Sequence, residues 1–204
     1  GSDGPRHTVV DGLSLGATVT SDADAKLSNA DLDDGVIVTP VYSGFNATYT
    51  VTVTNTTGAT AYLSFWIDIN GDGVFATTER FGNQVAVASA ATPTTLPYTI
   101  RMANAKAGTS YARFRLSTDS AAVSTPVGFA KDGEVEDILL TVSNSPYKNP
   151  STISTVLDGS GNNLDVTADG NVSPIDALQI INSLRLNGPR DLTLPATAVP
   201  PYLD

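Results

Sequence analysis

The stretch ATYTVTVTNT, residues 47–56, decides the expected fold. Tyr49, Val51 and Val53 alternate with threonines, so apolar side chains fall on one face and hydroxyl groups on the other. This period of two residues predicts a half-buried β-strand. Many short strands separated by turn residues predict an antiparallel β-sandwich. The other strand-like runs lie at 61–69, 85–89, 96–102, 111–117 and 134–142.

The character of the chain changes after this β-region. A polar segment rich in Ser, Asn and Pro comes first, as is typical of a linker. SPIDALQIINSLRL at 173–186 then has the apolar spacing of an amphipathic helix. Ser173 is a favourable N-cap, Pro174 suits the first helical position, and Gly188 ends the pattern. We therefore expect a sandwich at 1–142, a linker at 143–163 and a small segment at 164–204 that contains the helix.

Composition excludes several classes of function. The chain of 204 residues carries 21 acidic and 11 basic side chains, and it has no basic stretch that could neutralise nucleic-acid phosphates. It has no Cys, and a Ser-His-Asp triad would have to use its single histidine, His7, near the start of the chain. No apolar run approaches the ~20 residues that a membrane-spanning helix needs. We expect no nucleic-acid binding, no membrane insertion and no enzyme activity.

DINGDGVFATTE, residues 68–79, has the spacing of a calcium loop. A hard cation takes several oxygen ligands, and this twelve-residue pattern supplies them from positions 1, 3, 5, 7 and 12, with Gly at position 6. Strand-like sequence flanks the loop, so we do not expect helices to position the last ligand. The alternative is an Asx-rich hairpin turn without metal. The ligands would be Asp68, Asn70, Asp72, the Val74 carbonyl and Glu79.

DVTADGNVSPID, residues 165–176, repeats this spacing and runs directly into the predicted helix. Thr167 replaces the usual Asn or Asp at position 3, and Ser173 at position 9 either holds a water or caps the helix. An EF-hand-like loop followed by a helix is the architecture that such a site requires, so Ca²⁺ is the expected cofactor. The ligands would be Asp165, Thr167, Asp169, the Asn171 carbonyl and Asp176.

Other charged side chains have two interpretations each. One acidic group is a candidate for a further calcium cluster, because a cation relieves repulsion between two acidic segments; solvated loop charge is the alternative. This group is Asp33, Asp34, Glu136 and Asp137. A second set predicts a cross-strand ladder if its strands pair antiparallel, with a ligand site as the alternative. This set is Arg113 and Arg115 opposite Glu134 and Glu136.

The run YLSFWID contains the aromatic residues that a sugar-binding face could use. Tyr62, Ser64 and Trp66 alternate with apolar residues that belong to the core. Tyr62 and Trp66 would therefore form an exposed stacking platform, unless the tryptophan is buried, as is commoner in a sandwich.

Several motifs of the β-region resemble the GEVED domain of secreted bacterial proteins. They include VTVTNTTGATAYLSFWIDINGDGVF, GTSYARFRLST at 108–118 and DGEVEDILLTV at 132–142, and the resemblance extends over residues 5–142. It implies a non-catalytic extracellular module with a β-sandwich-like fold, located on the bacterial cell surface or secreted.

Residues 164–204 resemble a dockerin of planctomycete type, with LDVTADGNVSPIDALQIINSL as the first loop–helix repeat. PPYLD at 200–204 resembles the opening of a second repeat, so the resemblance is to a truncated dockerin. It implies a protein partner at the helix, either a cohesin-like domain or the chain's own sandwich. Positions 10 and 11 of the loop, which carry recognition contacts in cohesin-binding dockerins, are Pro174 and Ile175.

Together these observations predict a calcium-binding extracellular module for cell-surface assembly, anchoring or adhesion. The alternative function is that of a carbohydrate-binding module attached to a secreted polysaccharide-degrading enzyme, in which case the partner is a glycan.

Overall fold

The computed structural model describes residues 4–17, 34–144, 165–167 and 172–189. The chain divides into two compact units, Gly1–Ser143 and Asn144–Asp204, and each is described by itself.

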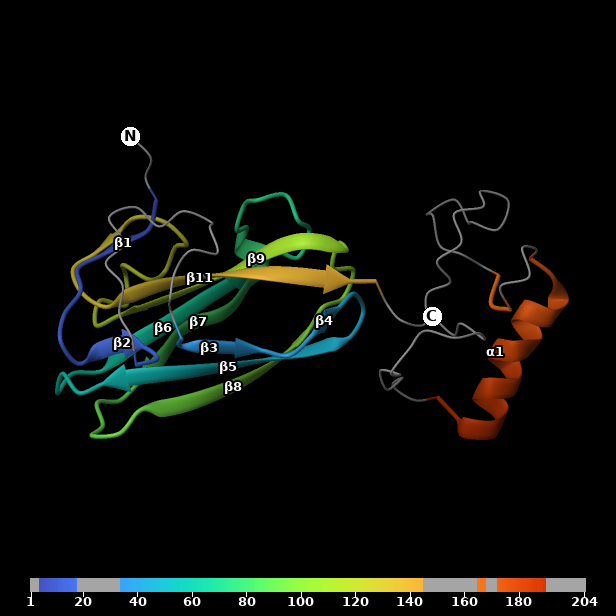
Figure 1. The fold of residues 1–204 in the computed structure, drawn as a ribbon, viewed down its shortest axis with the longest axis horizontal. Coiled ribbons are helices and arrows are strands. Elements are labelled where there is room, and N and C mark those ends of the chain that lie inside the picture. Colours follow the sequence, from blue (N-terminus) through green and yellow to red (C-terminus); the bar gives the residue numbers. More distant parts are fainter. Residues whose placement is uncertain (1–3, 18–33, 145–164, 168–171, 190–204) are drawn as a thin grey trace. The chain divides into compact units, whose positions relative to one another are not determined.

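The first unit is built from two facing β-sheets (Figure 1). One sheet has the strand order β4 (Val41–Tyr42), β11 (Glu134–Ser143), β9 (Gly108–Ser117), β6 (Ala61–Ile67) and β7 (Arg80–Val87). The other is centred on β5 (Asn46–Asn55), which pairs with β8 (Thr94–Arg101) on one edge and with β2 (Leu13–Leu15) and β3 (Val36–Val38) on the other. A separate ribbon joins β1 (Arg6–His7) to β10 (Phe129–Ala130). The predicted mainly-β class is confirmed. Most pairs are antiparallel, whereas β4–β11 and β1–β10 are parallel.

The core lies between the two sheets. Tyr49, Val51 and Val53 of β5 are fully buried, as their alternation predicts, and the threonines between them are half-buried. Phe65 of β6 stacks on Phe114 of β9 with ring centroids 5.0 Å apart. Removal of these apolar faces from water contributes roughly 25 cal/mol per Å² of buried area, which makes this core the main source of stability.

Some strands differ from the predicted ones. β7 begins at Arg80, although the alternating pattern starts only at Val85. Gln84 has a positive φ of 50°, and the β6–β7 register shifts near Phe65, so a bulge interrupts the period of two. The short strands β1, β2, β3, β4 and β10 were not predicted as elements, because two or three residues are too few to show a period.

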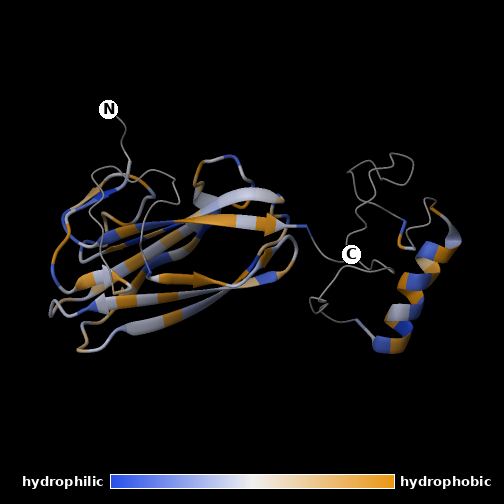
Figure 2. Ribbon diagram, viewed as in Figure 1, coloured by the Kyte–Doolittle hydropathy of each residue, from blue (hydrophilic) through white to orange (hydrophobic). Residues whose placement is uncertain are grey.

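The described part of the second unit contains the helix α1 (Pro174–Asn187). Its ends agree with the prediction: the Ser173 hydroxyl accepts a hydrogen bond from the Ile175 N–H, and Gly188 ends the helix with a φ of 68°. Figure 2 shows hydrophobic residues along its whole length. Leu178, Ile181 and Leu184 are each about half exposed. Among the described residues no helix is both long and apolar enough to cross a membrane.

Candidate functional site

The loop 68–79 begins where β6 ends, and the neighbouring strand β9 fixes its first residue. The Asp68 N–H donates to the Tyr111 carbonyl at 2.9 Å, and the Ser110 hydroxyl donates to the Asp68 carbonyl at 2.5 Å. The main chain of Asp68 is therefore held on both sides. Its side chain is 2% exposed, so the carboxylate points into the loop and not into solvent.

The Asp68 carboxylate organises the reversal that follows. Its Oδ1 accepts the N–H of Asp72 at 3.1 Å and its Oδ2 accepts the N–H of Gly73 at 2.9 Å. Gly73 has a φ of 80°, in the left-handed region where a side chain causes strain. The sharp turn predicted at the sixth loop position is therefore present at Gly73.

Asn70 and Asp72 form the tip of the loop. The Asn70 Oδ1 accepts the Asp72 N–H at 2.9 Å, and the Asn70 amide donates to Asp72 Oδ2 at 2.9 Å. Asp72 Oδ1 also accepts the N–H of Val74 at 2.8 Å. The structure thus brings the side chains at positions 3 and 5 into contact.

Glu79 closes the loop from its far end. It lies on a short 3-10 helix, η1 (Thr77–Glu79), and is 5% exposed. Its Oε1 accepts the Asn70 N–H at 3.2 Å and its Oε2 accepts the Ala76 N–H at 3.0 Å. We expected that no helix would position Glu79. This expectation is wrong, because Glu79 lies on a short 3-10 helix. The helix has only three residues and lies between two strands, so the sequence pattern did not indicate it.

The donor set of this loop fits a hard cation. Asp68 and Glu79 are buried carboxylates, yet neither forms an ion pair with a basic side chain in the part of the chain that the structure describes. A carboxylate has about four lone-pair positions, so acceptor positions remain after the main-chain N–H groups are bound. No three His, Cys, Asp or Glu side chains among the described residues form a metal-binding group by themselves. A calcium loop differs from such a group, because it also takes amide and main-chain carbonyl oxygens.

The second predicted loop is described in part. Asp165, Thr167 and Asp176 lie together, and Asp165 and Asp176 are 1% and 2% exposed. The Thr167 hydroxyl is 3.3 Å from Asp165 Oδ1 and 3.0 Å from Asp176 Oδ1. The predicted ligands Asp169 and Asn171 lie outside the described residues.

Asp176 joins this loop to the start of α1. Its carboxylate accepts the N–H groups of Thr167 at 3.0 Å and Ser173 at 2.8 Å. Burial opposes ionisation of this carboxyl, but the hydrogen bonds from Thr167 and Ser173 outweigh it and lower the pKa of Asp176 to about 2. Asp176 is therefore charged at neutral pH. Of the two roles predicted for Ser173, the structure shows the helix cap.

The three described residues of the further acidic group, Asp34, Glu136 and Asp137, do not all face one point. Asp33 lies outside the described residues. Glu136 and Asp137 are neighbours on β11 and therefore point to opposite faces of the sheet. Glu136 faces inward and accepts the Val36 N–H at 3.2 Å, whereas Asp137 pairs with Arg113. Asp34 accepts the N–H of Ala17 at 2.9 Å. Asp137 therefore does not join Glu136 in one cluster, and this part of the prediction is wrong.

The predicted charge ladder has the wrong register. β9 and β11 do pair antiparallel, but Glu134 stands opposite Leu116 and Glu136 opposite Phe114. Asp137, not a glutamate, is the partner of Arg113: Nε donates to Oδ1 at 2.7 Å and an Nη donates to Oδ2 at 2.6 Å. A shift of one residue moves every side chain to the other face of a strand. The sequence did not determine which residues of β11 share a face with Arg113 and Arg115.

The two glutamates connect the sheets of the sandwich, a role that the sequence analysis missed. Glu134 Oε2 accepts the Leu15 N–H of β2 at 2.6 Å, and Glu136 Oε1 accepts the Val36 N–H of β3. Both glutamates are at most 3% exposed. Their spacing of two residues indicates only that both glutamates lie on the same face of β11, and nothing in the sequence indicates that this face is the inner one.

Arg113 connects the candidate calcium loop to β11. Its guanidinium carbon lies 5.1 Å from the ring centroid of Phe75, the eighth residue of the loop, within the range of a cation–π contact. The same guanidinium binds Asp137 and donates to the Pro126 carbonyl at 3.0 Å.

The aromatic platform predicted for sugar binding is not available in this structure. Trp66 is 1% exposed and Tyr62 is half-buried. Trp66 lies on the outer face of its sheet, but it is covered, so its ring cannot stack on a sugar. Burial of the tryptophan, the alternative considered from sequence, is the observed state.

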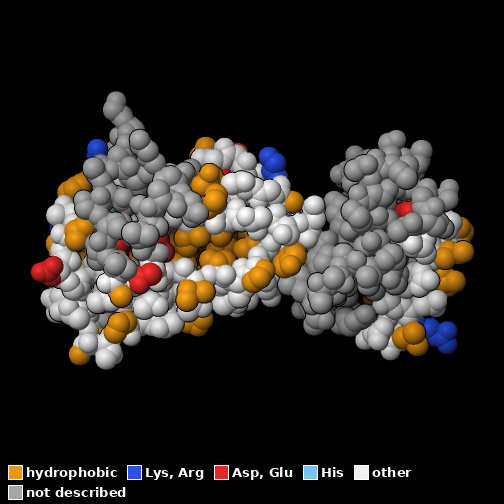
Figure 3. All heavy atoms as spheres, in the orientation of Figure 1, with side chains coloured by type: hydrophobic (Ala, Val, Ile, Leu, Met, Phe, Trp, Pro, Cys, Tyr) orange, Lys and Arg blue, Asp and Glu red, His pale blue; other side chains and the backbone are white. Residues whose placement is uncertain are grey.

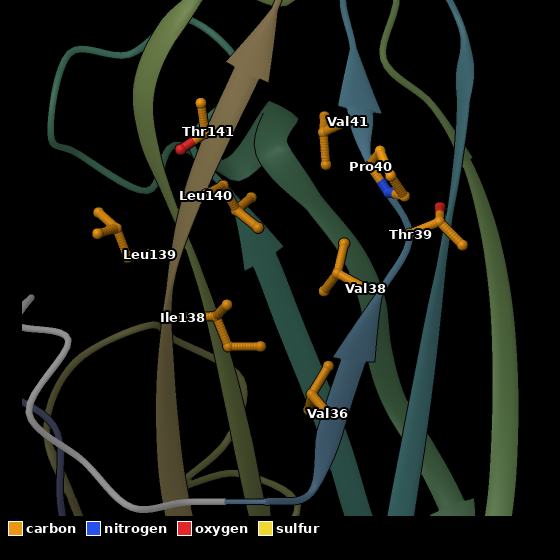
Figure 4. Close-up of a pocket in the computed structure, with 9 residues that line it drawn as sticks. All are labelled: Val36, Val38, Thr39, Pro40, Val41, Ile138, Leu139, Leu140 and Thr141. Atoms are coloured by element: carbon orange, nitrogen blue, oxygen red, sulfur yellow. The ribbon is translucent and has the colours of Figure 1, made fainter. Parts of the chain in front are cut away.

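An apolar groove of about 320 Å³ lies between β3–β4 and β11 (Figure 4). β11 pairs with β4 only at Val142 and Ser143, so the sheets are open at this edge. Ile138 and Leu140 point toward Val36 and Val38, and Figure 3 shows hydrophobic side chains gathered between these strands. Thr39 and Thr141 supply hydroxyl groups, and none of the described residues that line the groove is titratable.

The fold and the loop define a mainly-β module of two facing sheets with an acidic, oxygen-rich loop between β6 and β7. Comparison with protein families then shows that residues 62–141 match the GEVED domain. The predicted GEVED resemblance is confirmed over these residues, which include the loop 68–79 and most of the DGEVED strand.

Comparisons with curated proteins and with solved structures add no information about function. No curated protein matches the chain. Among solved structures, the CARDB domain of the PF1109 protein from Pyrococcus furiosus, in complex with di-metal ions, is similar over 53% of this chain and 89% of its own. Its sequence identity is 14% and the TM-score is 0.35, so this likeness carries no argument about function.

Proposed function

We propose that this chain is a non-catalytic, calcium-binding extracellular module that serves cell-surface assembly, anchoring or adhesion. The observation that carries the proposal is the loop 68–79, in which two buried carboxylates from opposite ends approach the same short segment. The GEVED match, together with the extracellular setting that the resemblance implies, supports the location outside the cell.

Calcium would stabilise the folded protein by binding to the loop 68–79. Asp68, Asn70, Asp72, Glu79 and the Val74 carbonyl would hold the ion, which supplies positive charge to the buried carboxylates. Because the unfolded chain does not hold these oxygens together, binding to the folded loop alone adds RT ln(1 + [L]/Kd) to the free energy of unfolding. The loop would then hold Phe75 against Arg113 and so support the contact with β11.

Removal of calcium is expected to destabilise the protein. Extracellular modules bind calcium with Kd values of about 10⁻⁴–10⁻³ M, so ~10 mM Ca²⁺ adds roughly 1–3 kcal/mol per site. We expect the melting temperature to be about 3–10 °C higher in Ca²⁺ than in EGTA, as measured by calorimetry.

The variant Asp72→Asn keeps the size of the side chain at the loop tip and removes one charge, so it should lose most of this calcium-dependent shift. Asp11→Asn makes the same chemical change at an exposed position outside the loop and should keep it. Equal melting temperatures of the wild-type protein in Ca²⁺ and EGTA at matched ionic strength would contradict the proposal.

We further propose that α1 provides a protein-binding face, in keeping with the predicted dockerin-like character of residues 164–204. Its apolar residues Leu178, Ile181 and Leu184 are about half exposed, and an amphipathic helix gains stability by covering such a face. The partner is either the sandwich of this chain or another chain.

A covered helix is expected to resist proteolysis. We expect either slow cleavage within residues 164–204 or self-association in light scattering. The double variant Leu178→Glu, Ile181→Glu should be monomeric and cleaved at least tenfold faster, because two buried charges would oppose docking. Asn182→Glu places a charge at an exposed position of the same helix and serves as the control. A wild-type monomer that is cleaved as fast as the double variant would exclude a covered helix.

A further inference from the structure

His7 lies in the short ribbon that attaches the start of the described chain to the sandwich. β1 and β10 pair over only two residues each. Two flanking main-chain bonds add to this pairing: the Arg6 N–H donates to the Gly128 carbonyl at 3.0 Å, and the Thr8 N–H donates to the Ala130 carbonyl at 3.2 Å. So small a ribbon depends on side-chain contacts for its stability.

The imidazole of His7 supplies two such contacts. Nδ1 lies 3.0 Å from the Asp132 carbonyl, and Nε2 lies 3.0 Å from Nε of Arg115. A guanidinium N–H can only donate, so Nε2 must accept and Nδ1 must carry the proton. The contacts therefore require the neutral form of the ring.

The contact between His7 and Arg115 is sensitive to the charge of His7, because Arg115 is itself a buried cation. Its side chain is fully buried, and three further N–H groups of its guanidinium bind main-chain carbonyls. It forms no ion pair with a carboxylate among the described residues. The distances are 2.7 Å to Thr125, 2.6 Å to Val127 and 2.8 Å to Gly128. The Gly128 carbonyl also accepts the Arg6 N–H, so Arg115 connects β1, β9 and the segment 125–128 through one charged group.

We propose that His7 and Arg115 form a proton-sensitive latch, in which protonation of His7 releases β1 and the segment 125–130 while the two sheets stay folded. A protonated ring would present an N–H to the N–H of Arg115, and two cations would stand in contact. The bond from Arg115 Nε to His7 is then lost, and the pairing of β1 with β10 loses its main side-chain support.

The charged groups around the ring do not remove this conflict. Arg115 of β9 faces His7 directly, and Arg113 on the same strand is paired with Asp137 of β11. The carboxylate of Asp132 is nearby, but it accepts hydrogen bonds from Ser117 and Thr118. Burial and Arg115 lower the pKa of His7 from 6.5 to about 4, although the Asp132 carbonyl and carboxylate act in the opposite direction.

The direction of the pH effect follows from this lowered pKa. The released state binds a proton at about pH 6.5 and the latched state only near pH 4, so the latch is fully stable above pH 6.5. It weakens as the pH falls from 6.5 to 4, where the opening equilibrium increases by roughly a hundredfold for a shift of this size.

Amide exchange of the wild-type chain, followed by NMR at pH 7 and pH 4, tests the latch. After correction for intrinsic rates, protection of the Arg6 and Thr8 amides should fall by about a hundredfold, whereas the amides of β6 and β9 should keep theirs. The Hε1 resonance of His7, the single histidine, should titrate near pH 4. A midpoint near 6.5, unchanged protection of Arg6 and Thr8, or equal loss of protection at all amides would overturn the proposal.

His7→Gln offers an uncharged acceptor to Arg115 at every pH. We expect this variant to show no pH-dependent change in protection at Arg6 and Thr8. Val9→Gln introduces the same side chain at an exposed neighbouring position and should keep the wild-type response. A response of His7→Gln as large as that of the wild-type protein would also overturn the proposal.

Discussion

Replacement of Gly133 by alanine is expected to unfold the sandwich or to lower its free energy of unfolding by more than ~3 kcal/mol. Gly133 has a φ of 88°, and an added Cβ would stand 1.9 Å from the Leu116 carbonyl oxygen. It would also stand 2.8 Å from the Leu116 carbonyl carbon and 3.1 Å from Cα of Ser117. These atoms belong to the backbone of β9, which is paired on both sides and cannot move away.

Gly58→Ala is the matched control for this prediction. Gly58 has a φ of 81° and nothing within 4 Å of its added Cβ, so its substitution introduces the backbone strain without the collision. The left-handed conformation alone costs an alanine about 1–2 kcal/mol. Urea denaturation of both variants measures the difference. Equal losses in the two variants would show that the approach of Gly133 to β9 has no energetic importance.

The second large effect is expected for Asp137→Ala. The Arg113 and Asp137 side chains are 6% and 1% exposed and bind each other through two parallel hydrogen bonds. Removal of the carboxylate leaves a buried guanidinium without this partner, while its contacts with the Pro126 carbonyl and the face of Phe75 remain. Breaking a buried pair in this way typically costs about 3–5 kcal/mol.

A double-mutant cycle provides the control for this pair. Replacement of both partners by alanine removes both charges, so the double variant should be destabilised less than the sum of Arg113→Ala and Asp137→Ala. The midpoint and slope of urea unfolding give the four free energies. If the losses are simply additive, the two side chains are not coupled and the interpretation of the pair is wrong.

The DGEVED motif is best understood as structural, because its glycine and its charged residues each make a contact that holds the sandwich together. Asp132 accepts hydrogen bonds from Ser117 and Thr118, and Gly133 allows close approach to β9. Glu134 and Glu136 reach across to the opposite sheet, and Asp137 neutralises Arg113. These contacts engage one oxygen of each glutamate and both oxygens of Asp137 with donors of the fold.

Local sequence patterns were sufficient to predict several structural elements. The alternation of Tyr49, Val51 and Val53 predicted the central strand and its buried face, because the period of a strand depends only on the backbone. The start and end of α1 followed from Ser173 and Gly188, since capping involves residues that are adjacent in sequence. The reversal at Gly73 followed from loop spacing for the same reason.

Contacts between distant segments could not be predicted in this way. His7 meets Arg115 and Asp132 across separations of 108 and 125 residues, and nothing in the local sequence indicates either contact. Burial of Trp66 on the outer face of its sheet depends on what covers that face, and an alternating pattern shows only which side it occupies.

The sequence by itself determined the mainly-β class, the faces of β5, the ends of α1 and the positions of the two oxygen-rich loops. Each of these depends on neighbours within one strand, turn or helix. Only the tertiary structure decided the partner of each charged side chain. Pairing between β9 and β11 was predictable, but a shift of one residue exchanges the two faces of a strand, and only the packing of the complete core determines which face of β11 lies inside.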